Sequence, residues 1–245
     1  MQLLVTDLGP LGYADALELQ RAAARARISG TIAEDLLLLV EHPPVVTLGR
    51  GTRATSLTTP PAVLAARGVD VHEVDRGGDV TFHGPGQLVG YPIIDLKRHR
   101  QDLHWYLRQV EEAIIRALVA FGIPGERNAG FTGVWTQGRK LASIGVHARD
   151  WVTWHGFALN VTTDLSYFDL MVPCGIADVT MTSVAREMAA DASDPAALGA
   201  RVRAEIVGGF AAVFGLEPVP LDAAALRAAL AAANPVLEGE VPSTT

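Results

Sequence analysis

Residues 36–40, four leucines and a valine, form the longest run of leucine, isoleucine and valine in the chain. Such a run predicts a short strand buried on both faces, because an amphipathic strand would alternate with polar residues. The other long apolar stretch, residues 206–216, is interrupted by glycines at positions 208, 209 and 215. Neither stretch approaches the ~20 apolar residues that span a bilayer, so we do not expect this chain to be a membrane protein.

Composition narrows the class of protein further. The chain has 245 residues, 49% hydrophobic and 19% charged, which is enough apolar material for a sizeable core. Its net charge of −7 argues against broad nucleic-acid binding, which needs a basic face. The single cysteine excludes an internal disulfide. The first residues lack the basic region and apolar stretch of a signal peptide, so we expect none. We therefore expect a cytoplasmic enzyme or binding protein.

Periodicity predicts helices and strands that are mixed along the chain. Apolar residues at three- and four-residue spacing predict a long helix at 102–121, opened by Asp102, and another at 13–28. The remaining predicted elements are strands at 35–41, 45–48, 69–74, 88–94, 132–136, 141–148 and 152–161, with helices in the alanine-rich C-terminal third. This arrangement predicts an α+β fold. No linker divides the chain, so we expect one domain over residues 1–235 and a flexible tail over 236–245.

A glycine-rich stretch at 76–87 holds four glycines and a proline in twelve residues. Its backbone must turn tightly or approach another group closely. A surface hairpin is one interpretation. The other is a ligand-binding loop, since His83 directly precedes a Gly-Pro-Gly turn, where a rigid scaffold would present it to a ligand. The stretch lacks the terminal Gly-Lys-Ser/Thr of a phosphate-binding loop.

Two residues are candidates for covalent and proton-transfer chemistry. Cys174 lies between a proline and a glycine, in a loop where a nucleophile would be accessible, although a lone cysteine is more often a buried apolar residue. Lys140 follows a turn and opens an apolar strand. It is either an exposed turn lysine or a desolvated one that can exchange protons, which arginine cannot do.

His147 and His155 flank the last predicted hairpin. A zinc site is the functional alternative, but their spacing, without a nearby cysteine or carboxylate pattern, is poor for zinc. We interpret them as structural histidines and expect no metal site.

Four stretches together resemble one family. They are RGGDVTFHGPGQLV at 76–89, KLASIGV at 140–146, HGFALNV at 155–161 and PCGI at 173–176. In this order they are similar to the lipoyl(octanoyl) transferases, which attach octanoyl groups to lipoyl domains. The resemblance covers residues 36–183 and does not extend past about residue 187. It implies the fold of the biotin and lipoate protein ligase catalytic domains, a mixed sheet with helices packed around it.

The resemblance also implies residue roles. Cys174 would carry the acyl group as a thioester, and Lys140 would stabilise the thiolate and move protons. The acyl site would be lined by Arg76, Gly77, Gly78, Asp79, Val80, Thr81, Phe82, His83, Ser143, Ile144, Gly145, Gly156, Phe157 and Ala158.

The partners implied are octanoyl-acyl carrier protein as donor, and the lipoyl domains of 2-oxoacid dehydrogenase complexes and the glycine cleavage H protein as acceptors. No cofactor is implied. Two alternatives remain: an ATP-dependent lipoate-protein ligase and a non-catalytic acyl-binding module on the same fold. A ligase would not need Cys174, and a binding module would not need Lys140.

Overall fold

Alternate residues of strand β2 (Asp35–Glu41) face two different helical layers. The structure, a computed structural model, describes residues 1–171, 179–188 and 193–233. Leu37 and Leu39 pack with the core beneath helices α3 (Leu103–Val119) and α5 (Pro195–Phe214). Leu36, Leu38 and Val40 pack on the opposite face, with α1 (Tyr13–Ser29) and α6 (Ala223–Ala233). The predicted buried strand is confirmed, and helices on both faces explain why it is apolar at every central position.

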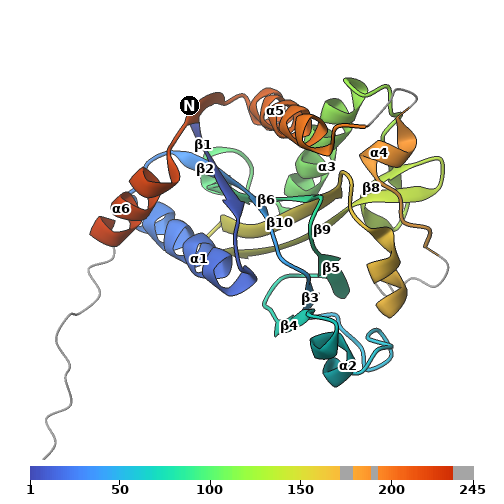
Figure 1. The fold of residues 1–245 in the computed structure, drawn as a ribbon. Helices are drawn as coiled ribbons and strands as arrows, with labels where there is room; N and C mark the ends of the chain where they lie inside the picture. The colour runs from blue at the N-terminus through green and yellow to red at the C-terminus, as the bar shows by residue number, and fades with distance from the viewer. Residues whose placement is uncertain (172–178, 189–192, 234–245) are drawn as a thin grey trace, which may run out of the picture.

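Strand β2 belongs to a large mixed sheet (Figure 1). Within the described residues its order is β11 (Glu217–Pro220), β1 (Gln2–Pro10), β2, β6 (Gln87–Ile93), β10 (Val152–Asn160), β9 (Arg139–Arg149), β8 (Phe131–Thr136) and β7 (Glu126–Asn128). Strand β1 pairs in parallel with β11 and β2, and the other pairs are antiparallel. The predicted α+β class, with a mixed sheet and packed helices, is confirmed.

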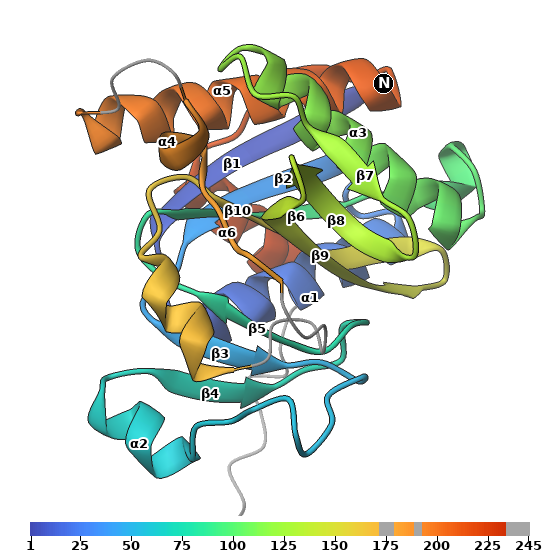
Figure 2. The same ribbon diagram turned by 90° about the vertical axis from the view of Figure 1, so that its right-hand side faces the viewer.

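A smaller sheet lies beside the large one (Figure 2). It is formed by β4 (Asp70–Glu73), β3 (Val45–Leu48) and β5 (Val80–His83), with helix α2 (Pro61–Ala66) next to it. Its side chains form a separate apolar cluster with the short 3₁₀ helix η2 (Leu165–Leu170). The glycine-rich stretch thus links β4 of the small sheet, through β5, to β6 of the large sheet.

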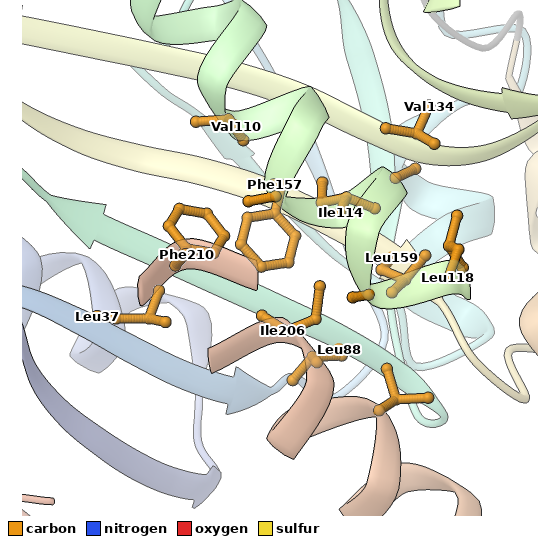
Figure 3. Packing of buried hydrophobic residues seen from close by; sticks show 14 of the residues in the cluster. Leu37, Leu88, Val110, Ile114, Leu118, Val134, Phe157, Leu159, Ile206 and Phe210 are labelled. Atoms are coloured by element: carbon orange, nitrogen blue, oxygen red, sulfur yellow. The ribbon is translucent and has the colours of Figure 1, made fainter. Parts of the chain in front are cut away.

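Helix α3 begins and ends close to where its sequence predicts. The Asp102 carboxylate accepts a hydrogen bond from the Trp105 N–H at 3.0 Å and caps the helix start. The buried face of α3 packs against α5 and the sheet, where Ile114, Phe157 and Phe210 point toward one another (Figure 3). Each such side chain contributes roughly 1.5–3 kcal/mol by burial.

Several elements lie outside the predicted set, and most of them, though not β1, are short or poor in strand-forming residues. Strand β7 has three polar residues and β11 contains two prolines, so neither carries a strand pattern. Strand β1 also escapes prediction. The remaining elements are the helix α4 (Val184–Glu187) and the 3₁₀ helix η1 (Leu96–Arg98). Across the described ranges, no helix combines the length and apolar character needed to cross a membrane.

Candidate functional site

A cavity of about 480 Å³ lies where β9 and β10 meet the glycine-rich stretch. That volume falls within the ~300–1,000 Å³ of typical small-molecule pockets. Its lining is mainly apolar and comes from α1, β6, α3, β8, β9 and β10 as well as from residues 76–83. The cavity therefore depends on both sheets.

Most of the expected acyl-site residues line this one cavity. They are Arg76, Gly77, Gly78, Asp79, Val80, Thr81, His83, Ser143, Ile144, Gly145, Gly156, Phe157 and Ala158, together with Lys140. Phe82 points elsewhere: its ring stacks on Tyr167 with centroids 4.5 Å apart. Cys174 lies in 172–178, outside the described residues.

Lys140 is a buried lysine, with only 1% of its surface exposed. Its ammonium nitrogen lies 5.3 Å from the centroid of the Trp135 ring, at cation–π distance. Its backbone N–H donates to the Thr180 carbonyl at 2.8 Å, and its own carbonyl accepts from the Thr182 N–H at 2.9 Å. The exposed turn lysine is thus excluded, and residues 180–182, a few positions after Cys174 in the chain, form an isolated β-bridge with Lys140.

The glycine-rich stretch closes the cavity over β9. The Gly77 N–H donates to the Val146 carbonyl at 2.9 Å. A Cβ on Gly145 would lie 2.7 Å from the Gly77 carbonyl oxygen and 3.1 Å from Arg76 Cδ. Arg76 is buried and donates to both the carbonyl and the hydroxyl of Thr47 at 2.9 Å. The stretch is therefore a wall of the cavity and not a surface hairpin.

A chain of side-chain hydrogen bonds runs from His83 toward Lys140. His83 Nδ1 pairs with Gln87 Oε1 at 2.9 Å, and the Gln87 amide donates to Asn160 Oδ1 at 3.0 Å. Asn160 in turn donates to the Thr182 carbonyl at 3.0 Å, and Thr182 pairs with Lys140. This network connects the glycine-rich stretch to the strand that carries Lys140.

His147 and His155 both contact Asp75, as structural histidines would. His155 Nε2 lies 2.8 Å from Asp75 Oδ1, and His147 Nδ1 lies 2.8 Å from the Asp75 carbonyl oxygen. Within residues 1–171, 179–188 and 193–233, no three histidine, cysteine or carboxylate side chains gather where they could hold a metal ion.

The cavity also includes residues outside the expected acyl-site set. They are Tyr13, Val89, Tyr91, Leu103, His104, Leu107, Gly130, Phe131, Thr132, Val146 and His155. Most of them occupy ordinary helix or strand positions, so nothing in their local pattern distinguishes them from core residues. The local pattern of apolar and polar residues carries no signal that these side chains meet in one cavity.

Two buried histidines beside the cavity make the protein sensitive to acid. The rings of His42 and His83 lie 5.8 Å apart. Burial lowers the pKa of His42 to about 4 and that of His83 to about 3, from 6.5, and the neighbouring ring of His42 lowers the pKa of His83 further. The unfolded histidines take up protons near pH 6.5, whereas the folded ones stay neutral until a much lower pH. The free energy of unfolding is therefore highest above pH 6.5 and decreases as pH falls toward 4.

We expect each of these histidines to lower the free energy of unfolding by about 2 kcal/mol between pH 7 and pH 5. Urea unfolding at several pH values measures this loss. His42→Gln should flatten the pH dependence over that range, whereas His104→Gln, at an exposed position, should not. An identical slope in the wild type and the His42 variant would contradict the assignment.

The sequence model of one protein family, described as "Lipoyl protein ligase A/B catalytic domain", matches residues 12–205. These residues include Lys140, Cys174 and the residues that line the cavity. The chain belongs to this family. Within it, the octanoyltransferase of Nostoc punctiforme is 47% identical over 214 residues, covering 87% of this chain and 89% of that protein. The octanoyltransferase of Acidobacterium capsulatum is 49% identical over 235 residues, covering 91% and 94%. The resemblance to the octanoyltransferases is confirmed, and the protein is an acyltransferase.

Solved structures share the fold at low sequence identity. A bi-partite lipoate protein ligase from Thermoplasma acidophilum has a TM-score of 0.75 at 16% identity, covering 95% of this chain and 91% of that one. A lipoate-protein ligase A bound with ATP has a TM-score of 0.74 at 14% identity, covering 95% and 93%. The expected likeness to the lipoate ligase fold is thereby confirmed.

Proposed function

We propose that this acyltransferase moves an octanoyl group from octanoyl-acyl carrier protein to a lysine of lipoyl domains, by way of a thioester on Cys174. The acceptors are the lipoyl domains of 2-oxoacid dehydrogenase complexes and the glycine cleavage H protein. Residues 1–235 would act as one catalytic domain in the cytoplasm, with 236–245 as a tail outside the described residues. The observation that carries the proposal is a buried lysine at an apolar cavity, in a chain about half identical to octanoyltransferases.

The first half-reaction exchanges one thioester for another. The Cys174 thiolate attacks the donor carbonyl, the donor C–S bond breaks, and the leaving carrier thiolate takes a proton from the Lys140 ammonium, which leaves Lys140 neutral for the second step. An unperturbed cysteine, with a pKa near ~8.5, is only a few per cent thiolate at neutral pH. An ammonium group beside it would stabilise the thiolate, and Lys140 is the candidate for that group.

The second half-reaction forms the amide. The acceptor amine attacks the enzyme thioester, the Cys174 C–S bond breaks, and the amine proton passes to Lys140. Because an amide is more stable than a thioester, this step releases free energy, and the reaction needs no ATP. The apolar lining supports an acyl substrate, since an eight-carbon chain gains roughly 0.8 kcal/mol per buried CH₂.

The ligase alternative is less well supported. The lipoate ligases named above share the fold at 14–16% identity, whereas the octanoyltransferases are 47–49% identical. A binding module without catalysis would form no covalent adduct.

Intact-mass measurement separates the three functions. The protein is mixed with octanoyl-acyl carrier protein, without ATP, and its mass is followed before and after a lipoyl domain is added. We expect an octanoyl adduct that disappears as the lipoyl domain gains the same mass. No adduct and no transfer would support the binding module, and transfer from free octanoate only with ATP would support the ligase.

Gly145→Ala should reduce octanoyl transfer at least about tenfold, or ~1.4 kcal/mol in the barrier. The new Cβ would lie 2.7 Å from the Gly77 carbonyl, which is backbone held by the Gly77–Val146 hydrogen bond. The cavity wall must therefore shift. The control is Gly208→Ala, a helical glycine with no atom within 4 Å of its added Cβ. Equal activity in the two variants would show that the wall does not shape the acyl site.

A further inference from the structure

Glu111 is a buried carboxylate on helix α3, with none of its side-chain surface exposed. One oxygen accepts from Arg108 Nη1 at 2.6 Å and from Arg127 Nε at 3.1 Å. The other oxygen accepts from the backbone N–H of Gly133 at 3.1 Å. A single carboxylate thus ties α3 to both strands of the β7–β8 hairpin.

Gly133 packs directly against the Lys140 side chain. A Cβ at this position would lie 3.0 Å from Lys140 Cε and 2.7 Å from the Ala142 carbonyl oxygen. Its φ of +145° is also one that other residues rarely adopt. The glycine backbone and the Trp135 ring therefore both contact Lys140 from β8.

The strand pairing is irregular on both sides of Gly133. Strands β8 and β9 shift register between Val134 and Trp135, opposite Ala142 and Lys140, so that Leu141 is an extra residue in β9. Strands β7 and β8 also shift register, between Glu126 and Asn128. Bulges are frequent beside active sites, where they redirect a side chain. The regular ladder is interrupted at both register shifts, and the Glu111 carboxylate supplies a further link to the Gly133 N–H.

We propose that Glu111 is a positioning residue for acyl transfer: through the Gly133 N–H it holds the bulged strand against Lys140 and so fixes the side chain of that lysine. This inference rests on the proposed function only for its effect on rate. Its structural part, the restraint on Lys140, can be measured without any substrate.

Glu111→Gln is the first test, with Glu112→Gln as its matched control. Glu112 is the next residue on the same helix and accepts a hydrogen bond from the same Arg127 at 2.8 Å, whereas the Gly133 N–H donates to Glu111. Glu111→Gln has one acceptor oxygen in place of two, and the two charged guanidinium groups compete for it, so the Gly133 N–H loses its acceptor. The variant should fold, because the Arg108 and Arg127 side chains are 47% and 39% exposed and keep access to water. We expect Glu111→Gln to lower kcat at least about tenfold with KM for the acyl donor within about twofold, and Glu112→Gln to change neither by more than about twofold.

Labelling of the two lysines tests the restraint directly. Lys97 and Lys140 are the only lysines in the sequence, so a pulse of acetic anhydride followed by peptide mass spectrometry compares them in one sample. Lys97, with 41% of its side chain exposed, is the internal reference. Glu111→Gln should raise the Lys140-to-Lys97 ratio at least about threefold, because a released strand opens more often. Glu112→Gln should leave it unchanged.

Each outcome decides the question. Unchanged labelling and unchanged kcat in Glu111→Gln would overturn the proposal. If that variant does not fold, Gly133→Ala replaces it, since all bonds to Glu111 can persist while the Lys140 contact changes; a full wild-type kcat in that variant would also overturn it. If Lys140→Ala keeps activity, the role proposed for Lys140 in acyl transfer fails, while the labelling ratio in Glu111→Gln still tests the restraint.

Discussion

Cys174→Ser should abolish octanoyl transfer, with a loss of at least about a thousandfold, or ~4 kcal/mol in the barrier. A serine hydroxyl is a far weaker nucleophile than a thiolate, and it needs a strong neighbouring base to be activated. Because Cys174 lies outside the described residues, the prediction rests on the sequence motif and on the octanoyltransferase relatives.

Two measurements check this prediction. Intact mass after mixing with octanoyl-acyl carrier protein should show the adduct in the wild type and none in Cys174→Ser. Thermal unfolding should show that the variant is folded, since the substitution removes one sulfur atom and adds one oxygen. A variant that keeps more than about a tenth of wild-type turnover would rule out the covalent intermediate.

Lys140→Arg should be nearly as damaging as Lys140→Ala, each lowering turnover about a hundredfold or more. Arginine keeps the positive charge but is not deprotonated in proteins, so it cannot accept the proton of the acceptor amine. The planar guanidinium group must also fit into the space where the Lys140 side chain packs on Gly133 and the Trp135 ring. Only 1% of the Lys140 surface is exposed there.

The matched control is Lys97→Arg, at the other lysine of the chain, which is partly exposed. It should retain full turnover. Lys140→Met separates shape from chemistry, because methionine fills a similar volume without charge. If Lys140→Arg alone kept most of the activity, Lys140 would act only through its charge, and its role in proton transfer would have to be abandoned.

Elements with a strong local pattern could be predicted from the sequence. The apolar spacing of α3, its Asp102 cap and the all-apolar centre of β2 are each encoded by neighbouring residues, and their bounds agree closely with the structure. The family resemblance carried by the motifs at 76–89, 140–146 and 155–161 also predicted most of the cavity lining. The resemblance to the octanoyltransferases depended on the same local stretches.

Other features were decided only by the tertiary structure. Phe82 lies in the same motif as the cavity residues, yet its ring turns toward Tyr167 in the small-sheet cluster. The sequence left open whether Lys140 is an exposed turn lysine or a desolvated one, and its burial depends on the bulge opposite Trp135 and on the glycine at 133. Glu111 reads as an ordinary acidic residue on a helix, although its carboxylate reaches a backbone N–H two elements away. Helix and strand patterns report contacts between residues near in the chain, whereas these features arise from register shifts and close approaches between distant segments, which no local pattern encodes.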